Sequence, residues 1–176
     1  MAEGIEANAG ALPADGELIL HVRTGRCSDL IELGRLTEAR RELEQLIDDS
    51  VRRQGPTAHR VLVAKGTLAK VLMREGDREG AARLLGEAIG AWAEAPTDVL
   101  ARLRTQHGVN LRALERWEEA ETEFAAVLEA EPDSLLARFN LGVLRAQAGD
   151  DAGALEHYER VLALDATHWM ARLNGA

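Results

Sequence analysis

The chain has few aromatic residues, few prolines and a single cysteine. Among its 176 residues only 3% are aromatic, four are proline and one, Cys27, is cysteine. One cysteine excludes an internal disulfide framework and any zinc site built on several thiolates. β-Branched residues are also scarce, whereas Ala, Leu, Glu and Arg are abundant, and this balance favours helices over strands. The composition therefore predicts a helix-rich protein of a reducing compartment.

Long apolar runs are absent as well. The longest is only a few residues, far short of the roughly 20 that a membrane-spanning helix needs. The first six residues lack the basic start and the apolar stretch of a signal peptide. A net charge of −9 also disfavours nucleic acid as a partner. We expect a soluble, cytoplasmic protein that neither inserts into a membrane nor binds nucleic acid.

Apolar residues recur three and four positions apart, which is the helical period. Pro56, Pro96 and Pro132 fall between such segments, where helices are expected to start or stop. The predicted fold class is all-α, with a short last helix beginning near 168 after eight longer ones. Those eight span approximately 17–33, 36–53, 57–75, 78–94, 98–113, 117–130, 135–147 and 151–164.

The predicted helices repeat in pairs. Ser134–Asn140 aligns with His168–Asn174, 34 residues later, through a shared Ala-Arg-x-Asn pattern. Small residues recur where paired helices must approach closely, at Cys27, Ala69, Gly108 and Gly142. Gly34, Gly76 and Gly149 stand at the turns within pairs, where a left-handed residue is cheapest as glycine. The chain is thus predicted to hold four helical hairpins and the start of a fifth.

With these features the chain resembles the tetratricopeptide-repeat (TPR) family, most closely over 135–168. The resemblance implies a right-handed α-solenoid of antiparallel helix pairs, whose first helices line a concave face. Two departures matter below: His107 stands where the family usually has leucine, and Glu115 replaces the turn glycine.

We divide the chain into a flexible leader and one TPR-like domain. The leader covers 1–16 and the domain 17–176. The predicted repeats cover about 17–55, 56–96, 97–133 and 134–167, and 168–176 form a partial fifth repeat or capping helix.

Charge separates between the two helix sets. The first-helix segments 57–74, 101–113, 134–147 and 166–176 carry ten Lys or Arg and no Asp or Glu, whereas the partner segments are acidic. If first helices line the concave face, a basic and apolar groove would suit a protein or peptide with acidic residues. The predicted groove residues are Lys70, Arg74, Arg102, Thr105, Val109, Arg112, Phe139, Val143 and Met170.

The same basic residues allow a second interpretation, in which they pair with carboxylates on adjacent helices. One repeat position, which is basic in every repeat, fits such structural pairing. It is occupied by Arg23, Lys65, Arg104, Arg138 and Arg172.

No catalytic constellation is recognisable. The five histidines show no metal-binding spacing, and no phosphate-binding glycine loop or nucleophile motif occurs. We expect no enzymatic activity, no cofactor and no metal.

The predicted function is a scaffold or adaptor for protein–protein interaction. One alternative is a recognition or regulatory segment of a larger enzyme, suggested by the unfinished fifth repeat. Another is homo-oligomer formation through the C-terminal repeat, whose end is apolar at Leu162, Leu164, Trp169, Met170 and Leu173.

Overall fold

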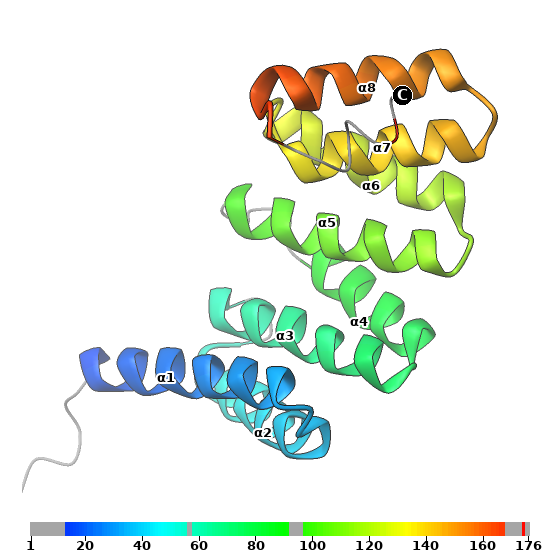
Figure 1. Ribbon diagram of the computed structural model, residues 1–176. Helices are drawn as coiled ribbons and strands as arrows, with labels where there is room; N and C mark the ends of the chain where they lie inside the picture. The colour runs from blue at the N-terminus through cyan, green and yellow to red at the C-terminus, as the bar shows by residue number, and fades with distance from the viewer. Residues whose placement is uncertain (1–12, 56–57, 92–96, 168–173, 175–176) are drawn as a thin grey trace, which may run out of the picture.

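Four antiparallel helix pairs stack into one array in the computed structural model (Figure 1). It describes residues 13–55, 58–91, 97–167 and 174, and of residues 13–21 and 97 the backbone alone. All regular elements in the described ranges are helices, which confirms the all-α prediction. They are α1 (Pro13–Glu32), α2 (Leu36–Gln54), α3 (His59–Glu75), α4 (Arg78–Gly90), α5 (Thr97–Ala113), α6 (Trp117–Ala130), α7 (Leu135–Gln147) and α8 (Asp151–Leu164).

The predicted helix bounds hold closely from α5 to α8 and deviate at two earlier places. Helix α1 begins at Pro13, inside the stretch predicted to be the leader, because proline suits the first helical position, where its missing N–H is not needed. Helix α4 ends at Gly90, earlier than predicted, since glycines at 86 and 90 weaken the helix. The helix predicted near 168 lies outside the described residues.

The four turns within pairs share one geometry. Each has a residue of positive φ: Gly34 at 73°, Gly76 at 88°, Glu115 at 60° and Gly149 at 77°. The next amide donates a hydrogen bond back to the carbonyl five residues earlier, as from Arg35 to Leu30 at 2.8 Å. This is the Schellman ending of a helix, and it confirms the three glycines predicted for these turns.

Paired helices approach most closely where the sequence has glycine. A Cβ at Gly108 would lie 2.8 Å from the ring of Phe124, and one at Gly142 would lie 2.6 Å from that of Tyr158. Both rings are buried. The predicted close approaches are therefore confirmed in the last two pairs.

Buried apolar residues form clusters that link each pair to the next. One joins α1, α2 and α3, another α3, α4 and α5, and a third is centred on α5, α6 and α7. Because α3 and α5 each pack against several neighbours, only a narrow face of these first helices stays open to solvent. That face positions the site.

Candidate functional site

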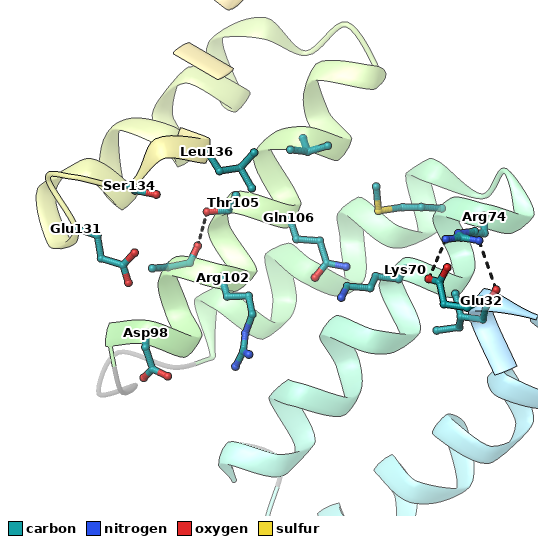
Figure 2. A pocket seen from close by; sticks show the side chains of 14 residues that line it. Glu32, Lys70, Arg74, Asp98, Arg102, Thr105, Gln106, Glu131, Ser134 and Leu136 are labelled. Atoms are coloured by element: carbon teal, nitrogen blue, oxygen red, sulfur yellow. Dashed lines mark hydrogen bonds and ion pairs between the residues drawn. The ribbon is translucent and has the colours of Figure 1, made fainter. Parts of the chain in front are cut away.

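The first helices form a groove of about 560 Å³. Its lining comes from α1, α3, α5, α7 and the loop before α7; among the described residues α2, α4, α6 and α8 contribute none (Figure 2). The lining residues are Ile31, Glu32, Lys70, Met73, Arg74, Asp98, Ala101, Arg102, Thr105, Gln106, Val109, Glu131, Ser134 and Leu136.

Five residues predicted for the groove line it. Lys70 and Arg74 lie one turn apart on α3, whereas Arg102, Thr105 and Val109 follow one face of α5. Spacings of three, four and seven residues bring side chains onto the same helix face. The structure thus gathers the predicted residues of the second and third repeats.

Three other predicted residues do not line this groove. Phe139 and Val143 pack against the buried cluster of α7 and α8, and the ring centroids of Phe139 and Tyr158 lie 5.8 Å apart. Arg112 has a buried Nε without a hydrogen-bond partner. Burial raises the pKa of Tyr158, and the nearby charge of Arg112 opposes that shift. These side chains occupy a helix face turned toward the packed interior. Met170 lies outside the described residues.

The cations of the groove differ in their partners. Arg74 donates to Glu32 Oε1 at 3.1 Å and to the Ile31 carbonyl at 3.4 Å (Figure 2). Lys70 and Arg102 are exposed lining residues without an ion pair in the described part of the chain. Two of the three groove cations are therefore available to an occupant.

Three carboxylates also line the groove, and sequence reasoning missed them. Glu32 ends α1, Asp98 lies in the first turn of α5, and Glu131 follows α6. They fall outside the uniformly basic segments on which the prediction rested. Asp98 could have been found, since it stands one turn before Arg102 on the same face. With three cations and three carboxylates, the lining is balanced in charge, not basic as a whole.

Hydrogen bonds fix the floor of the groove. Gln106 Nε2 donates to the Gly66 carbonyl at 2.8 Å and so ties α5 to α3. A Cβ at Gly66 would lie 2.8 Å from Leu103, which shows how closely the two helices approach. The Thr105 hydroxyl donates to the Ala101 carbonyl at 2.7 Å, within α5. The floor is therefore preformed.

The pairing interpretation holds for other basic residues. Arg104 pairs with Glu123 at 2.9 Å, and Arg145 pairs with Glu121. At the recurring basic position only Arg104 reaches a carboxylate; Arg138 donates to the Pro132 carbonyl. Arg23 and Lys65 have no ion pair among the described residues, and Arg172 lies outside them. The two interpretations thus apply to different residues.

His107 takes part in the most buried of these ion-pair clusters. Its Nδ1 lies 3.2 Å from Glu123 Oε1, and its side chain is 11% exposed. Burial acts to raise the pKa of Glu123, but the hydrogen bonds from His107 and Arg104 outweigh it and hold that pKa below its usual value. The polar side chain at a position usually occupied by leucine therefore joins α5 to α6.

The described residues contain no group of three or more His, Cys, Asp or Glu arranged to hold a metal ion. None of the described helices combines the length and the apolar character needed to cross a membrane.

The comparisons with known proteins agree with this architecture. Residues 105–168 match the family model described as tetratricopeptide repeat. No curated protein sequence matches the chain.

Solved structures share its fold at low sequence identity. A tetratricopeptide repeat protein from Parabacteroides merdae has a TM-score of 0.70 at 17% identity, covering 88% of this chain and 57% of that one. Pseudomonas aeruginosa pilF has a TM-score of 0.74 at 19% identity, with coverages of 90% and 67%. The TPR-like repeats of a Podosopora anserina kinesin light chain score 0.73 at 19% identity, with coverages of 85% and 76%. This chain thus spans little more than half of the Parabacteroides protein.

Proposed function

We propose that this tetratricopeptide-repeat protein is a non-enzymatic, cytoplasmic adaptor that binds an extended segment of a partner protein in its groove. The observation that carries the proposal is the pair of groove cations, Lys70 and Arg102, which have no carboxylate partner among the described residues. An acidic side chain of the bound segment would supply that partner. Residues 17–176 would act together as one binding domain.

Apolar contacts would supply the rest of the affinity. Leu136 is 53% exposed at the edge of the groove, and Val109 and Met73 are partly exposed within it. Exposed ion pairs contribute little free energy on their own, so an apolar anchor is needed beside the charge. Because Gln106 already fixes α5 against α3, the groove would lose little conformational entropy on binding.

The test is selection of random ten-residue peptides on the immobilised protein, followed by affinity measurements with charge-reversed variants. Replacing both cations, as Lys70→Glu with Arg102→Glu, should weaken binding by about tenfold or more, because attraction becomes repulsion. The affinity of the unaltered protein should also fall as salt rises.

The matched control carries the same charge change outside the groove. Arg53 on α2 and Arg83 on α4 are exposed and form no ion pair in the described ranges. The variant Arg53→Glu with Arg83→Glu should bind the selected peptides normally. Equal losses in the two variants, or no loss in either, would contradict binding at Lys70 and Arg102.

Self-association through the C-terminal repeat is a second candidate. Helix α8 exposes Leu155 and Leu164 at 43% and 37%. Sedimentation velocity over a range of protein concentrations tests it, and Leu155→Glu should shift the distribution toward monomer. A single species independent of concentration would contradict it.

A further inference from the structure

The charges along the groove are arranged in order, not mixed. Glu32 and Arg74 lie at one end, Lys70 and Arg102 in the middle, and Asp98 and Glu131 at the opposite end (Figure 2). The groove therefore has a cationic centre and one acidic end.

The two carboxylates of the acidic end are unpaired. Asp98 and Glu131 are exposed, and neither forms an ion pair within the described part of the chain. Arg102 stands one turn after Asp98 on α5, yet no ion pair joins them. At the other end Glu32 is already held by Arg74 at 3.1 Å. The charges left to an occupant are thus two central cations and two carboxylates to one side.

We infer that the groove selects a partner segment carrying both signs of charge, with an acidic side chain at Lys70 and Arg102 and a basic side chain at Asp98 and Glu131. This inference rests on the proposed function, since it specifies the occupant of the same groove. A purely acidic segment long enough to fill the groove would place like charge against Asp98 and Glu131, which opposes binding.

Helix geometry sets the spacing of the two charges. Asp98 and Arg102 are separated by about 6 Å along α5, at a rise of roughly 1.5 Å per residue. An extended peptide advances about 3.3 Å per residue, and Lys70 lies further across the groove. The acidic and basic residues of the occupant are therefore two to four positions apart, as an order-of-magnitude estimate. Leu136 and Val109 face an apolar residue between or beside them.

The test uses the ten-residue peptides selected on the full chain. Selected sequences should be enriched in a basic residue two to four positions from an acidic one. In a synthetic selected peptide, replacing its basic residue by Gln should weaken binding about three- to tenfold, as expected for contacts with two exposed carboxylates. The variant Asp98→Asn with Glu131→Gln should lose the same factor, and the two changes together should cost no more than either alone.

The control removes two exposed carboxylates of the second helices, as Glu118→Gln with Asp151→Asn, and should leave binding unchanged. Peptides that need Lys70 and Arg102 but show no enrichment in basic residues would overturn this inference and leave the proposed function standing. Additive losses from the peptide and protein changes would also overturn it. If no peptide is selected, or if binding ignores Lys70 and Arg102, both proposals fail.

Discussion

Glu115 carries the least favourable backbone conformation among the described residues. Its φ of 60° lies in the left-handed region, where the equivalent turns have glycine. A side chain with a Cβ pays about 1–2 kcal/mol there. The departure from the repeat pattern was visible in the sequence, and the structure shows that the turn keeps its shape despite the cost.

Replacing Glu115 with glycine should therefore stabilise the protein by about 1 kcal/mol, since the relief of strain exceeds the added entropy of the unfolded chain. Urea unfolding followed by circular dichroism measures the change. Glu118→Gly, in the interior of α6, is the control and should destabilise by a similar amount. A less stable Glu115→Gly variant would show that the turn is not strained.

Glu123 makes stability depend on acid. Burial opposes its ionisation, but the hydrogen bonds from His107 and Arg104 prevail and hold its pKa below the usual value. The unfolded chain then binds a proton more readily than the folded chain. The stability contributed by Glu123 is fully present above its unfolded pKa, near pH 4.5, and is lost as the pH falls through its folded pKa.

The variant Glu123→Gln should accordingly lose less stability between pH 7 and pH 3.5 than the unaltered protein does. Urea unfolding at the two pH values measures this difference. Glu129→Gln, on the exposed part of the same helix, should leave the pH dependence unchanged. Parallel pH profiles for Glu123→Gln and the unaltered protein would contradict the cluster.

At the level of elements, the helical hairpins were largely predictable. Period, prolines and turn glycines indicated the pairs, and the 34-residue repeat indicated which helices pack together. The start of α1 and the end of α4 were missed because Pro13 can begin a helix as well as precede one, and because glycines weaken α4 gradually.

The contact between α7 and α8 depends on the absence of a Cβ at Gly142. A Cβ there would lie 2.6 Å from the ring of Tyr158. Gly142→Ala should therefore destabilise the protein by about 1–3 kcal/mol, as overpacking does. Thermal unfolding measures it. Gly90→Ala, where a Cβ meets nothing within 4 Å, is the control and should be neutral or stabilising. Equal effects in the two variants would contradict close packing.

For the whole molecule, sorting of charge was predictable and the composition of the groove was not. Basic first helices and the family resemblance together led to Lys70, Arg74 and Arg102. The carboxylates Glu32 and Glu131 come from the ends of other elements, so only the three-dimensional arrangement brings them to the groove. Phe139 and Val143 were misplaced because a first helix has a packed face as well as an open one.

The central claim is that a partner segment binds along α3, α5 and the start of α7. Mapping the backbone amide chemical shifts of the isotope-labelled protein, with and without a selected peptide, tests it most directly. The largest changes should lie around Lys70, Arg102, Thr105 and Leu136, while α2, α4 and the middle of α8 stay unchanged. Changes concentrated on the second helices, with none at α3 and α5, would contradict the claim.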